Sequence, residues 1–233
     1  MGSWEAFDDA QLWPAEPANA EAKHQVALQM TERLRPGDVV GVGSGSTSLL
    51  TLHALAARAT TEGIDWLAVP TSYESELTCS ALGVRTTSLQ VARPDWSFDG
   101  ADEVDPDSNL NKGRGGALLR EKIVMASSPE RYVVVDESKL VERLGTNFAV
   151  PIEVLPEAVR LVRHALANLG VRDLSVRPGG TKDGPLITEH GNLILDAWLP
   201  AVDDATERHL QAIPGVVECG LFIGYAPTVL VAR

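Results

Sequence analysis

The sequence is poor in cysteine, in long apolar runs and in positive charge, and each shortage excludes a class of protein. Only Cys79 and Cys219 occur among 233 residues, without metal-ligand spacing, so neither a disulfide framework nor a zinc site is expected. No apolar run approaches the eighteen or more residues of a membrane span. The first twenty residues lack the basic and apolar segments of a secretion signal. We therefore expect a globular protein of the cytoplasm with no membrane partner.

Positive charge is scarce, with 20 Lys and Arg against 32 Asp and Glu and a net charge of −12. This balance argues against nucleic acid as a partner. It does not exclude a phosphorylated small molecule, because surface charges beyond about 8 Å are screened at physiological salt. One lysine 4 Å from a phosphate contributes roughly 4 kcal/mol per unit charge near a protein surface. The chain has five lysines in all: Lys23, Lys112, Lys122, Lys139 and Lys182.

Strand-like and helical segments alternate in the first part of the chain. Apolar residues at 26, 30 and 34 predict a helix that ends before Pro36-Gly37. β-Branched and apolar runs predict strands over residues 38–42, 66–70, 84–89, 96–98 and 132–135. Regular alternation of strand and helix is typical of an α/β fold, so we expect a Rossmann-like, mostly parallel sheet with helices on both faces.

The pattern changes after Pro151, where helices alternate with hairpin-like strands. We interpret this as a small inserted α+β domain of ferredoxin-like type over residues 148–212. The catalytic Rossmann-like domain is then expected over residues 20–147 together with 213–233. Residues 1–19, rich in Ala, Pro and Asp, are predicted to be a flexible N-terminal extension.

Residues 97–122, SFDGADEVDPDSNLNKGRGGALLREK, concentrate the chemistry of the chain. They contain a cluster of acids, a lysine, a glycine-rich turn and a helix with a further glutamate: Asp99, Asp102, Glu103, Lys112, Gly113, Gly115, Gly116 and Glu121. Carboxylates, an ammonium group and a turn that opens a helix are the parts needed for proton transfer on a bound anion.

A second glycine-rich segment, GVGSGST, follows the first strand and precedes a helix. A dinucleotide-binding loop is one interpretation, but the third glycine of G-x-G-x-x-G is missing, with Ser46 or Ser48 in its place. Hydroxyls and backbone amides at a helix N-terminus suit a single phosphate better. A plain tight turn capped by serine remains the third alternative.

Four motifs in this order, GVGSGST, FDGADEVD, NKGRGGALLREK and VVVDESK, resemble type A ribose-5-phosphate isomerase, and the similarity runs from Glu21 through nearly the whole chain. The resemblance implies an aldose–ketose isomerase that interconverts ribose 5-phosphate and ribulose 5-phosphate through an enediolate. It implies no cofactor and no metal, and a homodimer or homotetramer. Three of the five lysines, Lys23, Lys112 and Lys139, fall at positions of the family pattern.

The resemblance also implies roles for single residues. Glu121 matches the general base, and burial would suit it by raising the pKa of its carboxyl toward neutrality. Asp99 and Asp102 match residues that contact the sugar hydroxyls, with Asp99 a candidate for assisting ring opening. Lys112 matches the lysine that holds the developing oxyanion together with the backbone amides of Gly113 to Gly115.

The phosphate is expected to be held by Lys23, Lys139, Ser46 and Thr47. The other residues expected to contact the substrate are Ser44, Gly45, Gly100, Ala101, Gly113, Arg114 and Gly115. Arg114 is either an exposed loop residue or a group that approaches the phosphate.

Structural alternatives remain for several of these residues. Glu121 alone could be a surface glutamate paired with a basic neighbour, and the two aspartates could form a turn with a helix cap. Glu103 is expected to be structural, and Asp105 and Asp107 to be solvated loop acids. Lys122 and Lys182 are expected at the surface.

Two departures from the family pattern and two rival functions complete the sequence-based picture. Tyr73-Glu74 stands where family members often have basic or small residues, and the chain stops at Arg233, short of the usual tail. One rival is a non-catalytic sugar-phosphate sensor, which the lack of a basic helix-turn-helix segment disfavours. The other is a deaminase or coenzyme A transferase of the same superfamily, for which no acyl-transfer motif is present.

Overall fold

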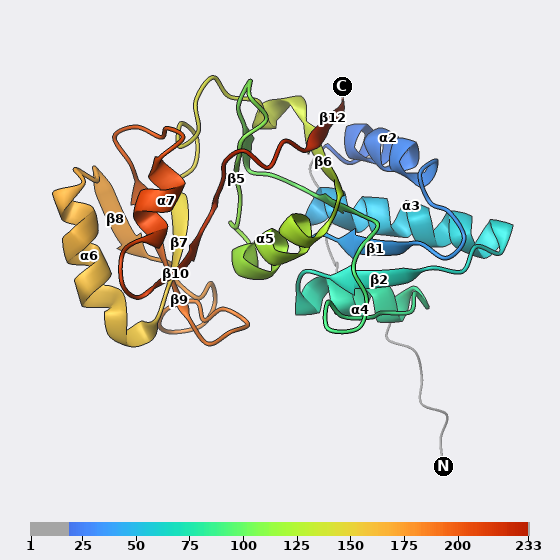
Figure 1. Cartoon of the computed structure of the whole chain (residues 1–233), viewed down its shortest axis with the longest axis horizontal. Coiled ribbons are helices and arrows are strands. Elements are labelled where there is room, and N and C mark those ends of the chain that lie inside the picture. Colours follow the sequence, from blue (N-terminus) through green and yellow to red (C-terminus); the bar gives the residue numbers. More distant parts are fainter. Residues whose placement is uncertain (1–18, 233) are drawn as a thin grey trace, which may run out of the picture. The chain divides into compact units, whose positions relative to one another are not determined.

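The computed structural model describes residues 19–232, which fold into two compact units (Figure 1). The first unit consists of residues 19–100, Ile123–Glu137 and residues 227–232. The second consists of Ala101–Lys122 and Ser138–Ala226. Of the predicted N-terminal extension, all but Asn19 lies outside the described residues.

The first unit is built on a five-stranded parallel sheet with the strand order β12-β6-β3-β1-β2. Its strands are β1 (Val39–Val42), β2 (Leu67–Pro70), β3 (Trp96–Asp99), β6 (Glu130–Asp136) and β12 (Thr228–Ala232). Its helices are α2 (Ala20–Thr31), α3 (Ser46–Glu62), α4 (Tyr73–Ala81) and the second half of α5 (Leu118–Ser127). The Rossmann-like parallel sheet expected from the sequence is confirmed.

Helices cover both faces of this sheet, as the residues of β1 illustrate. Val40 and Val42 point into a core that includes Met30 of α2 and Leu52 of α3. The intervening Gly41 faces the other way, where an added Cβ would lie 2.6 Å from a methyl group of Val124 in α5. Alternation of side chains along a strand therefore sends β-branched residues to one helical layer and allows α5 a close approach on the other.

One predicted strand of the first unit is absent. Residues 84–89 form no strand, and only an isolated bridge links Thr86 to Ala68 of β2. Apart from Val84 and Leu89 the segment is polar, RTTS, with too few apolar side chains to fill a further strand position. β2 is consequently the last strand at this edge of the sheet.

The second unit contains two antiparallel sheets, one with the order β10-β7-β9-β8 and a smaller one with the order β11-β5-β4. Their strands are β4 (Glu103–Val104), β5 (Leu110–Asn111), β7 (Val150–Val154), β8 (Asp173–Val176), β9 (Leu193–Trp198), β10 (Val216–Cys219) and β11 (Leu221–Phe222). Two helices, α6 (Val159–Asn168) and α7 (Thr206–Gln211), and the 3₁₀ turns Glu137–Lys139 and Pro156–Ala158 complete the elements. A separate antiparallel α+β unit is thus confirmed.

The larger sheet of the second unit has an apolar face and a polar face. Val150 and Ile152 of β7 point into a core shared with Val162 of α6 and Leu210 of α7. The alternate positions, Glu153 of β7 and Asp196 of β9, lie on the opposite face. This polar face also carries the buried Ile194, which borders the glycine-rich turn at residues 113–116, because a Cβ on Gly116 would lie 3.6 Å from its side chain.

The bounds of the two units differ from those of the predicted domains. The sequence places residues 20–147 and 213–233 in one domain and residues 148–212 in the other. In the structure, residues 101–122, 138–147 and 213–226 pack within the second unit. Strand pairing is the reason, because β10 joins β7 and β11 joins β5.

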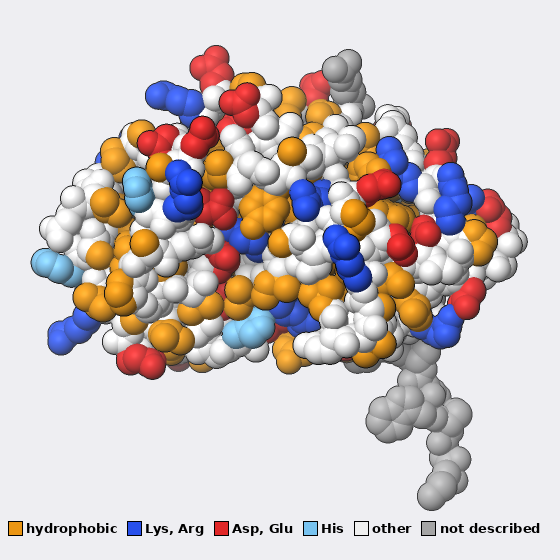
Figure 2. Space-filling model, viewed as in Figure 1, with side chains coloured by type: hydrophobic (Ala, Val, Ile, Leu, Met, Phe, Trp, Pro, Cys, Tyr) orange, Lys and Arg blue, Asp and Glu red, His pale blue; other side chains and the backbone are white. Residues whose placement is uncertain are grey.

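Acidic and basic side chains are interspersed over the face shown in Figure 2. No helix within residues 19–232 combines the length and the apolar character needed to cross a membrane.

Candidate active site

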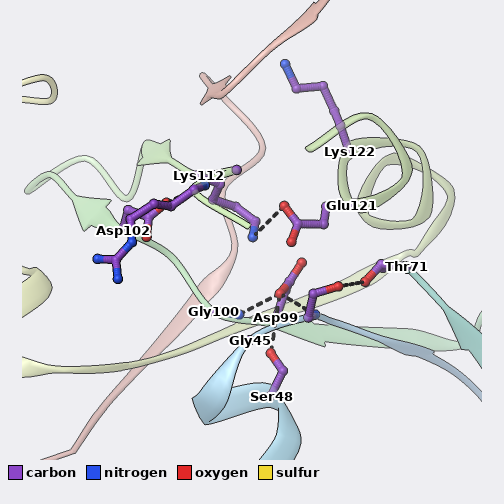
Figure 3. A network of polar contacts seen from close by, with 12 residues as sticks. Gly45, Ser48, Thr71, Asp99, Gly100, Asp102, Lys112, Glu121 and Lys122 are labelled. Atoms are coloured by element: carbon purple, nitrogen blue, oxygen red, sulfur yellow. Dashed lines mark hydrogen bonds and ion pairs between the residues drawn. The ribbon is translucent and has the colours of Figure 1, made fainter. Parts of the chain in front are cut away.

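Asp99 ends β3 and is held in a cradle of hydrogen-bond donors. One oxygen of its carboxylate accepts the backbone N–H of Gly100 at 2.7 Å, the backbone N–H of Ser44 at 3.2 Å and the hydroxyl of Ser48 at 3.3 Å (Figure 3). The side chain is buried, with 3% of its surface exposed. Gly43 permits this approach, because a Cβ there would lie 2.3 Å from the Asp99 carboxylate. The carboxylate is therefore fixed at the carboxyl edge of the sheet, where open α/β sheets bind ligands.

The predicted phosphate loop follows β1 and opens α3. Gly45 precedes the helix with a φ of +81°, a left-handed conformation that favours glycine. Ser46 begins the helix, and the buried ammonium of Lys23 donates to its hydroxyl at 3.1 Å. Lys23 also lies 3.9 Å from the Asp136 carboxylate. The structure thus brings together a predicted lysine and the predicted serine at a helix N-terminus.

Three hydrogen bonds of this loop are not foreseen from the sequence. The hydroxyl of Ser44 donates to that of Ser72 at 2.7 Å and lies 2.9 Å from that of Thr71. The backbone N–H of Gly45 donates to the carboxylate of Glu74, 3.0 Å away. Glu74 therefore occupies a backbone donor that the sequence assigns to the phosphate.

In the second unit, Lys112 and Glu121 form a buried ion pair. Nζ of Lys112 lies 3.1 Å from a carboxylate oxygen of Glu121, and the two side chains are only 3% and 6% exposed (Figure 3). Lys112 comes directly after β5, where its backbone N–H donates to Gly220. Glu121 lies in the first turn of α5. A buried pair costs desolvation of both charges, so it is weak evidence for a purely stabilising role.

The glycine-rich turn between these residues is held from both sides. The backbone N–H of Arg114 donates to the Asp102 carboxylate at 3.1 Å. The carbonyl oxygens of Gly113 and Arg114 accept from the guanidinium of Arg177, at 2.7 and 2.8 Å. Gly113 has a φ of +98°, and a Cβ there would lie 2.6 Å from Leu118. Both the backbone conformation and the close contact therefore require glycine.

Arg114 and Lys139 share one aromatic neighbour. The guanidinium carbon of Arg114 lies 5.4 Å and Nζ of Lys139 5.3 Å from the centre of the Phe148 ring. Arg114 is exposed, which agrees with the first of the two alternatives predicted for it. Phe148 is held by Glu103, whose buried carboxylate accepts the backbone N–H groups of Gly145, Asn147 and Phe148 and the side-chain amide of Asn111. Glu103 is thus a structural anchor, as expected.

Lys122 corrects the prediction that it lies at the surface. Its side chain is buried, and its ammonium donates to the carboxylates of Glu207 and Glu218 at 2.6 and 2.7 Å. It also donates to the carbonyls of Cys219 and Leu221 at 2.9 and 2.7 Å. Figure 3 shows it directed away from Glu121. Its position four residues after the apolar Leu118 on one helix face could have indicated burial. Lys182 is exposed, as predicted.

The predicted site residues are divided between the two units. The first unit contains Lys23, Ser44, Gly45, Ser46, Thr47, Asp99 and Gly100, and the second contains Ala101, Asp102, Lys112, Gly113, Arg114, Gly115, Glu121 and Lys139. Among residues 19–232, no group of three His, Cys, Asp or Glu side chains is arranged to hold a metal ion. Arg177 belongs to no motif, and Glu74 was noted only as a departure from the family pattern. Neither contact could be predicted, because the partners lie 64 and 29 residues away in the chain.

The family model of ribose 5-phosphate isomerase A (phosphoriboisomerase A) matches residues 67–233. The chain belongs to the ribose 5-phosphate isomerase A family. The ribose-5-phosphate isomerase A of Methanothermobacter thermautotrophicus is 46% identical over 210 residues, which cover 89% of this chain and 92% of the relative. That of a Synechococcus strain is 46% identical over 215 residues, covering 91% and 92%.

Solved structures of ribose 5-phosphate isomerase have the same fold. The isomerase A of Methanocaldococcus jannaschii superposes with a TM-score of 0.88 at 37% identity and covers 93% of this chain and 96% of its own. An isomerase solved in complex with phospho-erythronic acid gives a TM-score of 0.88 at 39% identity, over 91% and 94% of the two chains. The family resemblance read from the four motifs is therefore confirmed over nearly the whole chain.

Proposed function

We propose that this chain is an aldose–ketose isomerase that interconverts D-ribose 5-phosphate and D-ribulose 5-phosphate. The observation that carries the proposal is the buried Lys112–Glu121 ion pair beside the glycine-rich turn, in a chain of the ribose 5-phosphate isomerase A family. A carboxylate and an ammonium in contact are a base and an electrophile, which are the two groups that proton transfer next to a carbonyl needs. The alternative of a non-catalytic sensor gives no reason to bury this pair.

The geometry supports a division of labour in the second unit. In the proposed reaction Glu121 removes the proton from C2 of the open-chain aldose, and the electron pair forms the C1–C2 double bond of the enediolate. Negative charge then develops on the former carbonyl oxygen, where Lys112 and the backbone amides of the turn stabilise it. The hydroxyl proton passes from O2 to O1, Glu121 returns its proton to C1, and the C2–O bond becomes the carbonyl of the ketose. Lys112 is held at the end of β5 and Glu121 on a helix, so neither position depends on a flexible loop.

The remaining predicted residues are proposed as substrate ligands. Asp99 and Asp102, three residues apart in the chain, would accept hydrogen bonds from sugar hydroxyls, and Asp99 would assist ring opening. Gly100 and Ala101 between them would contact the sugar through their backbone. The hydroxyls of Ser44, Ser46 and Thr47, the backbone of Gly45, and the cations Lys23 and Lys139 would bind the phosphate. Arg114 is proposed as a further contact to the substrate. The hydrogen bond from Lys23 to Ser46 supports a cation in that position.

A cytoplasmic location and a homodimer or homotetramer belong to the same proposal. The free, buried thiols of Cys79 and Cys219 are compatible with a reducing compartment. No cofactor and no metal take part in the proposed mechanism, because Lys112 supplies the positive charge at the oxyanion.

The proposal is tested by incubating the enzyme with ribose 5-phosphate in deuterated water and following both ribulose 5-phosphate formation and exchange at C2. Wild-type protein should catalyse both. Glu121→Gln should lower kcat by about two to four orders of magnitude while KM changes little, because the base is lost and the ligands remain. Glu189→Gln, which alters a half-buried glutamate paired with Arg120, should stay within a few-fold of wild type. Near-normal turnover by Glu121→Gln would refute the assignment of the base.

A further inference from the structure

Arg177 is a buried arginine outside the predicted site that contacts the glycine-rich turn directly. It follows β8, and its backbone N–H donates to the carbonyl of Ile194 in β9 at 2.8 Å. Only 8% of the residue is exposed. Its Nε donates to one carboxylate oxygen of Asp196 at 2.9 Å, and Nη2 pairs with the other oxygen. The guanidinium is thus fixed by a two-point ion pair on the polar face of the four-stranded sheet.

The remaining side of the guanidinium faces the turn. Nη1 donates to the carbonyl oxygens of two successive residues, Gly113 at 2.7 Å and Arg114 at 2.8 Å. One rigid, charged group therefore fixes the orientation of two adjacent peptide planes. Three glycines stand among residues 113–116, and glycine has the greatest conformational freedom to lose. Inside the turn the N–H of Gly116 donates to the carbonyl of Gly113 at 3.0 Å, and Arg177 adds the external contact that holds the next carbonyl, that of Arg114.

The consequence for the opposite side of the turn follows from peptide geometry. In a planar trans peptide the N–H points away from the preceding carbonyl. With the carbonyls of Gly113 and Arg114 directed at Arg177, the N–H groups of Arg114 and Gly115 point away from it. On that side the N–H of Arg114 donates to the carboxylate of Asp102 at 3.1 Å, so the N–H of Gly115 is the donor of this pair that is directed at a ligand. Two successive amides oriented alike form a concavity suited to negative charge.

We propose that Arg177, locked by Asp196, is a positioning residue that presets the backbone donors of the turn for the enediolate oxyanion. The inference rests on the isomerase function proposed above and adds a residue that acts through the turn. Lysine cannot replace it, because a single ammonium cannot bind two carbonyls and both oxygens of a carboxylate in a planar fork. Preorganised donors matter because misplacement by about 1 Å costs roughly 100-fold in rate.

The test compares Arg177→Lys, Arg177→Met and Asp196→Asn with Arg172→Met. Arg172 lies just before the same strand, β8, and donates to the carbonyl of Leu199, so its loss controls for removing an arginine from this region. For each variant kcat and KM are measured with ribose 5-phosphate. Inhibition constants are measured for phospho-erythronic acid, whose carboxylate imitates the charged enediolate, and for inorganic phosphate, which reports only phosphate binding.

Arg177→Lys should lower kcat by about 100-fold. It should also weaken the binding of phospho-erythronic acid by about tenfold or more. The inhibition constant of phosphate should stay within about twofold of the wild-type value. Asp196→Asn should show the same pattern more weakly, and the double variant should lose less than the product of the single losses, because both act through one contact chain. Arg172→Met should resemble wild type.

Inhibition constants do not depend on the fraction of active protein, so partial unfolding cannot imitate this pattern. If Arg177→Met does not fold, Arg177→Lys and Asp196→Asn decide the question. The role of Arg177 is overturned if the variants bind phosphate and phospho-erythronic acid equally more weakly. It is also overturned if kcat is unchanged in Arg177→Lys. Either result leaves the proposed isomerase function standing. Wild-type protein that fails to isomerise ribose 5-phosphate overturns the proposed function and this inference together.

Discussion

At the residue scale, the two buried lysines Lys112 and Lys122 lie ten positions apart in the chain and have different surroundings. Both ammonium groups lie near the Phe222 ring, 5.7 and 4.7 Å from its centre. Lys112 faces the carboxylate of Glu121 on the helix that follows the turn. Lys122 is enclosed by two carboxylates and two carbonyls. An ammonium group has three N–H donors, so these four acceptors leave Lys122 with no donor for a substrate. Lys112 is therefore the lysine proposed to take part in the reaction.

Glu74 gives a residue-scale prediction about phosphate binding. Its carboxylate accepts the Gly45 amide at the start of α3, so an incoming phosphate must displace a negative charge from its own predicted ligand. Glu74→Gln should therefore lower KM and the inhibition constant of phosphate by about two- to fivefold, from the 0.3–1 kcal/mol typical of a charge at a helix N-terminus. kcat should not change. Steady-state kinetics at low ionic strength measure the effect most clearly.

The matched control for Glu74 is Glu76→Gln, which removes an equal charge from the same helix, α4, two residues away. Glu76→Gln should leave KM and the inhibition constant of phosphate equal to the wild-type values within experimental error. A KM that rises in Glu74→Gln would show instead that the glutamate helps to shape the loop.

The turn and helix α5 form the element that carries the proposed chemistry, and Lys122 is its attachment to α7 and to β10. The contacts with Glu207 and Glu218 join residues 85 and 96 positions apart. Burial alone lowers the pKa of Lys122, but Cys219 and the carboxylates of Glu218 and Glu207 outweigh it and raise the pKa above its usual range. Because that pKa is raised on folding, this contribution to stability is present at neutral pH and is lost only as pH rises through the raised pKa of the folded state.

Replacing Lys122 tests this element. Lys122→Met should reduce the free energy of unfolding by about 3–5 kcal/mol, because it leaves two buried carboxylates without their cation. kcat should fall as well, since Glu121 precedes Lys122 on the same helical turn. Urea unfolding followed by circular dichroism measures the first effect, and the isomerase assay measures the second. Lys182→Met, which removes an exposed lysine of the same unit, is the control and should change neither.

Adding Glu207→Gln and Glu218→Gln to Lys122→Met should recover part of the lost stability, since the unpaired charges are then gone. A Lys122→Met variant as stable as wild type would contradict the structural assignment.

At the element scale, the sequence correctly predicted the helices and strands whose formation depends on residues close together in the chain. The spacing of Val26 and Met30 predicted α2, and the β-branched run of β1 predicted a buried strand. Residues 84–89 were wrongly predicted as a strand because their few apolar positions resemble an edge strand. The contacts of Arg177 and Glu74 could not be predicted, because each depends on strands or loops that tertiary structure alone brings together.

At the scale of the whole molecule, the chain passes between its two units four times, after Gly100, Lys122, Glu137 and Ala226. Neither unit is therefore one continuous segment, and α5 contributes to both. Each unit nevertheless has its own apolar core, with Cys79 in the first and Cys219 in the second. The only two thiols of the chain thus report on different cores.

These thiols provide a prediction about unfolding. Burial raises the pKa of Cys79 and of Cys219 to about 12, so the reactive thiolate is only about one part in 10⁴ at pH 8. In native protein neither thiol should react with iodoacetamide within minutes, whereas both should react fully in 8 M urea. Because the units share four crossings and a helix, we expect the two cysteines to become reactive at the same urea concentration, as peptide mass spectrometry would measure. Labelling of Cys219 at a urea concentration that leaves Cys79 protected would show that the second unit opens independently.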